Sequence, residues 1–244
     1  MQSAKKLKTE NTFLTAEWRK LIFAQYEVSE EVLQKYLPKN VELDAWQGKY
    51  YVSLVGFIFT DVRLLRVKIP FHSHFEEVNL RFYVKYKDGE IWKRGVVFIS
   101  EVVPKAAITL IANTIYGEKY STSKMSYELK ESSESMSIAF SWKKKRWHKF
   151  SVDASNVGEP IKLGGESEFI TEHYWGYTKV SKDKTSEYGV QHPRWDEYEV
   201  KDYQIDVDFG VNYGADFAHL STEKPYSVIF AEGSPIRIMG GRKF

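Results

Sequence analysis

The sequence has no cysteine among its 244 residues. Disulfide bonds, thiolate catalysis and cysteine-ligated metal sites are therefore excluded. It also has no run of about 18 uninterrupted apolar residues, the length that a membrane-spanning helix requires. The first residues (MQSAKKLKTENTF) lack the apolar core of a signal peptide. The formal net charge of +2 favours neither nucleic acid nor a membrane as partner. We expect a soluble, cytoplasmic protein.

Signatures of several enzyme classes are missing as well. The sequence contains no phosphate-binding loop, no dinucleotide fingerprint and no nucleophile elbow. The HEXXH pattern of zinc hydrolases is also absent. We therefore expect no cofactor and assign no metal site.

Aromatic residues, in contrast, are abundant: they make up 16% of a chain that is 43% hydrophobic, enough to bury a sizeable core. No linker or repeat divides the sequence, so we expect a flexible leader over residues 1–12 and a single domain over residues 13–244. The fold class that we predict is mainly β (α+β), a curved or closed sheet with a few short helices. Strands are expected at residues 21–26, 50–59, 77–86, 95–99, 126–130, 136–142, 169–179, 187–191, 203–209 and 226–231, and helices near residues 29–37 and 105–116.

Residues 77–86 alternate strictly between polar and apolar side chains. Glu77, Asn79 and Arg81 share one face of the predicted strand, while the apolar residues between them share the other. The polar face has two interpretations. It faces water, or, if the sheet curls into a barrel, it lines a cavity in which the charges are paired.

Lys105 stands where a predicted strand meets a predicted helix. Pro104 suits the first helical position, which places Lys105 in the first turn, against the positive end of the helix dipole. That field favours the neutral amine, the form that attacks a carbonyl compound to give a Schiff base. The alternative is a solvated, charged lysine, and the local sequence leaves both open.

Three further clusters have a functional and a structural interpretation. His72 and His74 can place both rings on one side of a strand, as metal ligands do, but no third ligand is recognisable. Residues 143–149 (KKKRWHK) are a basic patch that could stack on a nucleic-acid base, or solvated residues at a hairpin end; we expect no nucleic-acid partner. The aromatic segments at residues 171–177 and 191–195 fill a core or wall a pocket for a small organic ligand.

Several segments together resemble the uncharacterised YqjF-like family, from about Phe13 to the C-terminus. They are residues 18–24 (WRKLIFA), 36–38 (YLP), 77–81 (EVNLR), 116–120 (YGEKY), 172–177 (EHYWGY) and 192–195 (HPRW). That family more distantly resembles acetoacetate decarboxylase. Residues 28–44 are similar to a decarboxylase segment with a helix, a Leu/Val-Pro pair and a strand, and residues 101–105 are similar to its segment ending in Tyr-Pro-Lys-Lys.

The resemblance implies an antiparallel, barrel-like sheet with a central cavity into which Lys105 points. In the decarboxylase the first lysine of the pair forms the Schiff base, and the second lowers its pKa. Lys105 matches the first lysine, but Ala106 occupies the second position. Other YqjF-like proteins can carry arginine at the first position, and arginine forms no enamine because it stays protonated.

We therefore predict an internal pocket that binds a small acidic or carbonyl-bearing molecule. The alternative is a Schiff-base lyase, similar to a β-keto-acid decarboxylase, with Lys105 as nucleophile and Glu77 and Glu101 as catalytic carboxylates. A homo-oligomer is possible, and the ligand's identity is left open. The residues predicted to bind the ligand or substrate are Arg81, Arg19, Asn79, Tyr116, His173 and Trp175.

Overall fold

A computed structural model describes residues 12–68, 73–105 and 119–244. Almost all of the expected leader lies outside these residues, as does the helix expected near residues 105–116, apart from Lys105 itself. Lys105 lies two residues after the end of a strand and has no regular secondary structure.

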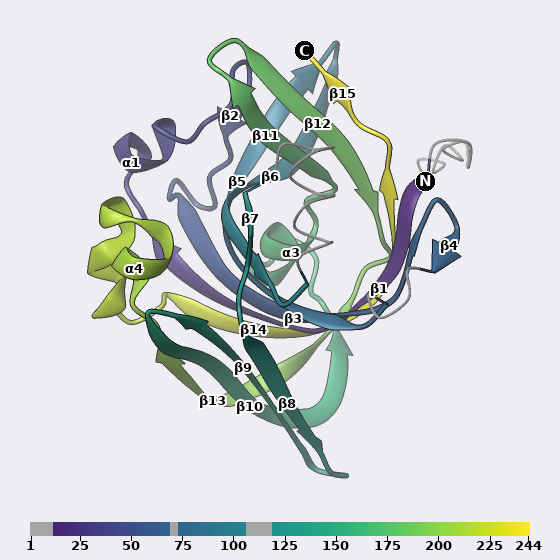
Figure 1. Ribbon diagram of the computed structural model, residues 1–244, viewed down its shortest axis with the longest axis vertical. Helices are drawn as coiled ribbons and strands as arrows, with labels where there is room; N and C mark the ends of the chain where they lie inside the picture. The colour runs from purple at the N-terminus through teal and green to yellow at the C-terminus, as the bar shows by residue number, and fades with distance from the viewer. Residues whose placement is uncertain (1–11, 69–72, 106–118) are drawn as a thin grey trace.

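The long strands of the sheet close into a ring (Figure 1). Going round it, the order is β12-β11-β6-β5-β3-β1-β14, and pairing of Val190 in β12 with Ile238 in β14 closes the circle. The predicted curved or closed β sheet is confirmed. The bounds of these strands are Thr12–Glu27 (β1), Tyr51–Leu64 (β3), Phe75–Asp88 (β5), Ile91–Val103 (β6), Trp175–Ser181 (β11), Lys184–Gln191 (β12) and Ser227–Met239 (β14).

The sheet is mainly antiparallel, as the family resemblance implied, with two parallel pairs that involve β6. Most neighbours are antiparallel, but β6 pairs in parallel with β11, where Gly95 lies opposite Trp175. Strand β6 also pairs in parallel with the short strand β7 (Tyr120–Thr122), where Glu101 lies opposite Tyr120. The other short strands are β2 (Glu42–Leu43), β4 (Val67–Lys68) and β15 (Arg242–Lys243).

A second layer extends from the ring through β14, because Phe230 of β14 also pairs with Tyr198 of β13. The order continues β13-β10-β9-β8, below the ring in Figure 1. The hairpin expected at residues 126–142 is confirmed as β8 and β9. The bounds in this layer are Met125–Glu131 (β8), Ser135–Lys144 (β9), Arg146–Pro160 (β10) and Asp196–Asp206 (β13).

The helices of the described residues are short. The predicted helix after Ser29 is confirmed as α1 (Glu30–Gln34), and it lies outside the ring near α4 (Phe209–Tyr213) and the 3₁₀ helix η2 (Ala215–Ser221). Helix α3 (Glu166–Thr171) lies within the ring in Figure 1. The strand expected over residues 169–179 is therefore wrong in its first part. There the helix follows Gly165 and begins with acidic residues in its first turn, which suits a helix N-terminus.

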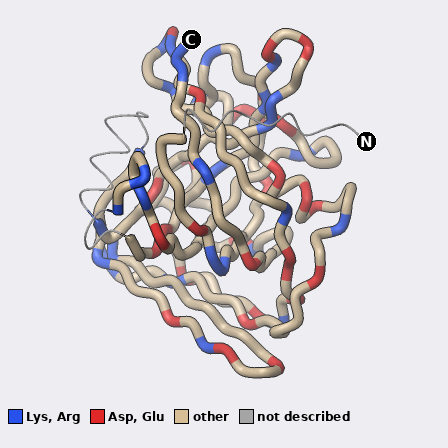
Figure 2. The backbone as a smooth tube through the Cα atoms, turned by 90° about the vertical axis from the view of Figure 1, so that its right-hand side faces the viewer, with Lys and Arg blue, Asp and Glu red and all other residues tan. Residues whose placement is uncertain are grey.

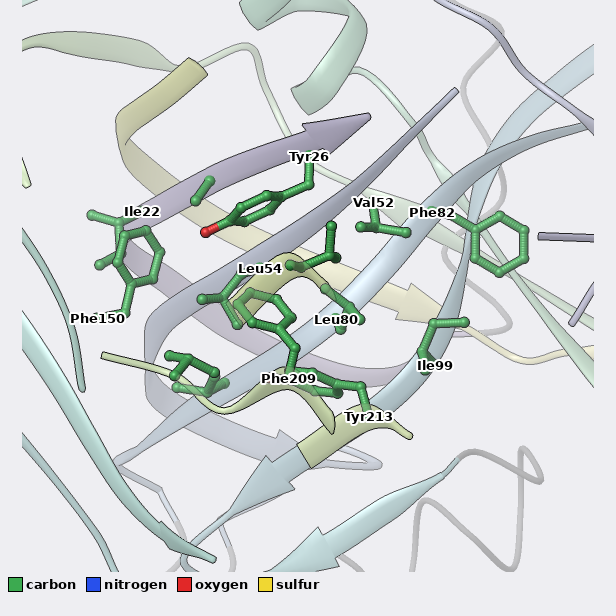
Figure 3. Close-up of a cluster of buried hydrophobic side chains, with 14 of the residues drawn as sticks. Ile22, Tyr26, Val52, Leu54, Leu80, Phe82, Ile99, Phe150, Phe209 and Tyr213 are labelled. Carbon is green, nitrogen blue, oxygen red and sulfur yellow. The ribbon is translucent and has the colours of Figure 1, made fainter. Parts of the chain in front are cut away.

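The ring strands bury both faces, which divides the core in two. Ile22 and Leu54 belong to an outer cluster between the ring, α4 and the second layer (Figure 3). The neighbouring Phe23 and Val55 belong to an inner cluster, which includes Phe169 of α3. Alternate residues of one strand thus serve two cores, which explains the nearly continuous apolar run of β3.

Candidate functional site

The inner face of the ring encloses a cavity. Its volume is about 60 Å³, measured as the space open to the centre of a water molecule. A water needs room for only about one probe sphere, roughly 10–15 Å³ of occupied volume, so this space holds several waters. The described residues that line it are Trp18, Leu21, Val55, Phe57, Phe59, Glu77, Asn79, Arg81, Val96, Phe98, Glu101, Tyr120, Thr171, His173, Trp175, Gly176, Tyr188, Val190, His192, Trp195 and Ile238.

Strand β5 presents its polar face to this cavity. Glu77 and Asn79 are only 1% and 2% exposed, and Glu101 on β6, directly opposite Asn79, is 1% exposed. Asn79 Nδ2 donates to Glu77 Oε1 over 2.9 Å, and the Tyr120 hydroxyl donates to Glu77 Oε2 over 3.0 Å. Of the two interpretations of the alternating residues 77–86, the structure has the one in which this face is turned inward. The hydrogen bonds from Asn79 and Tyr120 hold the Glu77 carboxylate in a defined orientation.

Arg81 brings a positive charge to the same cavity. Its Nη2 donates to the Ile170 carbonyl of α3 over 3.1 Å, and its guanidinium lies 5.3 Å from the centre of the Phe23 ring. Within the described part of the chain, no carboxylate oxygen lies within 4.0 Å of this guanidinium, and its buried Nε has no hydrogen-bond partner. A partly buried cation without a carboxylate partner is costly unless an anion compensates it.

His173 lies beside Arg81 and is neutral. Its side chain is 1% exposed, and its Nε2 lies 3.3 Å from Asp44 Oδ2. Asp44 also accepts from Arg94 Nε over 2.6 Å. Burial lowers the pKa of His173 to about 4, with Arg94 and Arg81 adding to the shift and Asp44 opposing it. The hydrogen bonds from His173 and Arg94 hold the pKa of Asp44 below its usual value despite its burial. At neutral pH the pair is an imidazole and a carboxylate.

Aromatic rings wall another side of the cavity. The His192 ring stacks on Trp195 with centroids 4.4 Å apart, and Trp18 packs edge-on against Trp195 at 6.3 Å. Burial lowers the pKa of His192 to about 4 as well. His192 also lines a second groove, together with Thr15 and Arg237. This wall is apolar and uncharged at neutral pH, as in most small-molecule sites.

Six of the residues predicted for the pocket lie around this one cavity: Glu77, Asn79, Arg81, Glu101, His173 and Trp175. Tyr116 lies outside the described residues. Lys105 is half-buried and is not among the described residues that line the cavity. The functional roles of all the residues predicted for the pocket stay predictions.

Arg19 does not line the cavity. It pairs instead with Glu17 at 3.0 Å and Glu232 at 3.5 Å. The reason is a bulge in β1 at Lys20, whose backbone is left-handed with a φ of 55°, and the register with β3 shifts there. Beyond the bulge Leu21 lines the cavity, and before it Trp18 does, so the bulge turns Arg19 away from the interior.

The structure adds cavity residues that the sequence did not single out for the site, among them Trp18, Thr171 and His192. The segment containing His192 was recognised only as an aromatic cluster. Asp44 was missed entirely, because its contact with His173 joins residues 129 positions apart and leaves no local pattern.

The histidine pair and the basic patch of the sequence have less structural support as functional sites. His72 lies outside the described residues, and His74 is exposed with its Nε2 2.6 Å from the Tyr127 hydroxyl. Among the described residues no group of three or more His, Asp or Glu side chains is arranged to hold a metal.

The basic patch lies at the β9–β10 turn, where Arg146 pairs with Asp206. Lys and Arg are interspersed with Asp and Glu along the backbone (Figure 2). No helix in the described ranges is long and apolar enough to cross a membrane.

Solved structures with the same fold are acetoacetate decarboxylases and their relatives. Acetoacetate decarboxylase from Legionella pneumophila superposes with a TM-score of 0.66 at 14% identity, covering 100% of this chain and 92% of that one. The enduracididine biosynthesis enzyme MppR complexed with pyruvate gives 0.65 at 11% identity, covering 99% and 93%. An acetoacetate decarboxylase-like enzyme from Sphingomonas wittichii gives 0.62 at 10% identity, covering 100% and 99%. The fold that the sequence resemblance implied is confirmed.

Sequence comparison identifies closer relatives. The uncharacterized protein YqjF of Bacillus subtilis is 26% identical over 181 residues, which are 73% of this chain and 72% of that protein. The model of the DUF2071 family, described as an uncharacterized conserved protein, matches residues 15–235. The match covers both the ring and the second layer, and the chain belongs to the DUF2071 family.

Proposed function

We propose that this protein binds a small acidic molecule, with or without a carbonyl group, in the cavity of the ring. The observation that carries this proposal is the Arg81 guanidinium, which lines the cavity and has no carboxylate partner among the described residues. A ligand carboxylate would supply the missing charge and accept paired hydrogen bonds from the planar guanidinium. The apolar wall of Trp18, Trp175 and Trp195 would exclude water from this ion pair.

The comparisons support the same class of ligand. One structure with this fold is a complex with pyruvate, a small keto acid, and others are acetoacetate decarboxylases. A cavity of about 60 Å³ would admit a molecule of this kind. Arg81 is the one lysine or arginine among the described residues that line the cavity, so a ligand with one carboxylate is favoured over a ligand with two.

Binding should depend on the carboxylate itself. We expect lactate, pyruvate and acetoacetate to bind about 10–100-fold more tightly than their primary amides, because a hydrogen bond to a charged group is worth about 1.5–3 kcal/mol. The amides have almost the same shape and serve as matched controls. Isothermal titration calorimetry at low salt measures the ratio. Equal affinities for acid and amide would show that Arg81 does not select an anion.

A second candidate function is a Schiff-base lyase that uses Lys105. Lys105 follows β6, the strand on which Glu101 borders the cavity, and it is half-buried. Its amine would attack the ketone of a β-keto acid, water would leave, and the resulting iminium would accept the electron pair released with carbon dioxide. The sequence difference at Ala106 weighs against this candidate, since the neighbouring lysine that lowers the pKa in the decarboxylase is absent.

Borohydride trapping distinguishes the two candidates. If the lyase reaction occurs, incubation with acetoacetate and borohydride should give a reduced adduct at Lys105, located by mass spectrometry, and Lys105→Arg should abolish it. Lys93, which packs over the Trp175 ring at 4.0 Å, is the internal comparison. An adduct on Lys93 instead, or none at all, would leave non-covalent binding as the function. A cytoplasmic location and a homo-oligomeric state stay predictions from the sequence.

A further inference from the structure

The Asp44–His173 pair is rigidly built. Asp44 follows β2, and its backbone N–H donates to the Tyr83 carbonyl over 3.0 Å. The His173 ring lies between Tyr83 at 4.8 Å and Phe169 at 5.1 Å, measured between ring centres. Three separate elements therefore fix the imidazole in one orientation. Such support is expected where a ring nitrogen must point in a defined direction.

The contacts also determine which nitrogen carries the proton. Asp44 is ionised, and a carboxylate only accepts, so His173 Nε2 must be the donor in their contact. The neutral ring then has its lone pair on Nδ1. This atom is buried, and it has no hydrogen-bond partner in the described ranges 12–68, 73–105 and 119–244. A buried acceptor without a partner is uncommon in native proteins and costs stability.

His173 and Arg81 lie at the same cavity. Both line the cavity. The Arg81 guanidinium lies 5.7 Å from the centre of the Tyr83 ring, the same ring against which His173 packs. Arg81 also holds the Ile170 carbonyl, one residue from Phe169. Arg81 and His173 thus line one cavity of about 60 Å³, in which a single small molecule could contact both residues.

We infer that His173 Nδ1 accepts a hydrogen bond from a hydroxyl group of the ligand whose carboxylate Arg81 binds. The ligand class is then a small hydroxy acid, or the enol form of a keto acid. This inference rests on the proposed function and deepens it. Asp44 acts as a positioning residue, because it keeps the proton on Nε2 and so leaves Nδ1 as the acceptor.

The test compares lactate with 2-fluoropropanoate, which has nearly the same shape but no hydroxyl proton. We expect the wild-type protein to bind lactate about ten-fold more tightly, since the fluoro analogue leaves the buried acceptor unsatisfied. His173→Gln keeps an amide nitrogen near the place of Nε2 but no acceptor near Nδ1, so the ratio should fall to about one. His173→Asn keeps a polar group near Nδ1 and should retain part of the preference.

Two further variants test the role of Asp44 and the specificity of the effect. Asp44→Asn removes the constraint on the tautomer, because an amide can accept as well as donate, and should lower the ratio. His219→Gln, at an exposed histidine of η2, should leave the ratio unchanged. The ¹⁵N chemical shifts of the His173 ring in the wild-type protein give a readout that needs no variant. They should report a neutral ring protonated on Nε2 at pH 7.

The outcomes separate this inference from the proposed function. If both acids bind equally and Arg81→Gln weakens both, the role of His173 is wrong and the proposed function stands. A proton on Nδ1 in the ¹⁵N spectra would likewise overturn the role of His173 alone. If neither acid binds the wild-type protein, the inference fails together with the carboxylate site.

Discussion

Replacing Arg81 by glutamine is expected to weaken the binding of lactate and pyruvate by about 10–100-fold, because the charge-assisted hydrogen bonds to the carboxylate are lost. Glutamine is shorter and also loses the hydrogen bond to the Ile170 carbonyl of α3, so the fold of this variant is checked separately. Arg81→Lys keeps the charge but not the planar fork, and we expect an intermediate affinity. Titration calorimetry on the three proteins measures the order.

Arg63→Gln is the matched control for the loss of one positive charge. Arg63 is partly exposed and pairs with Asp61 at 3.1 Å, so its loss should change affinity little. If Arg63→Gln and Arg81→Gln weaken binding equally, the effect is a general loss of charge and the Arg81 site is not the binding site. Circular dichroism of each variant establishes that the fold is retained.

Acidification should destabilise the protein through His173. Its pKa is about 4 in the folded state against 6.5 as the ordinary value. Between these values the unfolded chain holds a proton that the folded protein lacks, so stability falls as pH falls. Because one pKa unit corresponds to about 1.4 kcal/mol, the free energy of unfolding should drop by about 2–3 kcal/mol from pH 7 to pH 4.5 through this residue alone. Urea denaturation at the two pH values measures the change.

His173→Gln isolates this contribution, because it removes the titrating group. The variant should lose less stability than the wild-type protein over the same pH interval, by about the same 2–3 kcal/mol. Asp44 does not contribute in this window, since its pKa lies below 3.8 in the folded state and its effect appears only at lower pH. His219→Gln should match the wild-type protein. Identical acid sensitivity of the wild type and His173→Gln would contradict a buried neutral imidazole.

Local patterns predicted much of the sheet and part of the cavity. The strict alternation of residues 77–86 located β5 and the shared face of Glu77, Asn79 and Arg81, because side-chain direction in a strand depends only on its period of two. That the same face turns inward follows from ring closure between β12 and β14, which no local pattern encodes.

The two wrong predictions, for Arg19 and for residues 169–179, also have their cause in tertiary structure. Arg19 was assigned to the pocket although a bulge at Lys20 interrupts the alternation of β1, and nothing in the sequence requires a left-handed lysine there. The first part of residues 169–179 was read as a strand because aromatic residues favour strands, yet Phe169 and Ile170 are buried on a helix inside the ring. Tertiary packing outweighed propensity in both places.

Strand β14 links the two ends of the described chain, and this pairing has a consequence for how the protein folds. Thr12 lies opposite Met239, so one edge of β1 stays unpaired until almost the whole chain has been synthesised. Closing a loop of that length is entropically unfavourable, and folds dominated by such contacts form slowly. An incomplete nascent chain would expose the β1 edge and its apolar inner face to other chains. Premature termination near the C-terminus should therefore yield an aggregation-prone product rather than a shortened barrel.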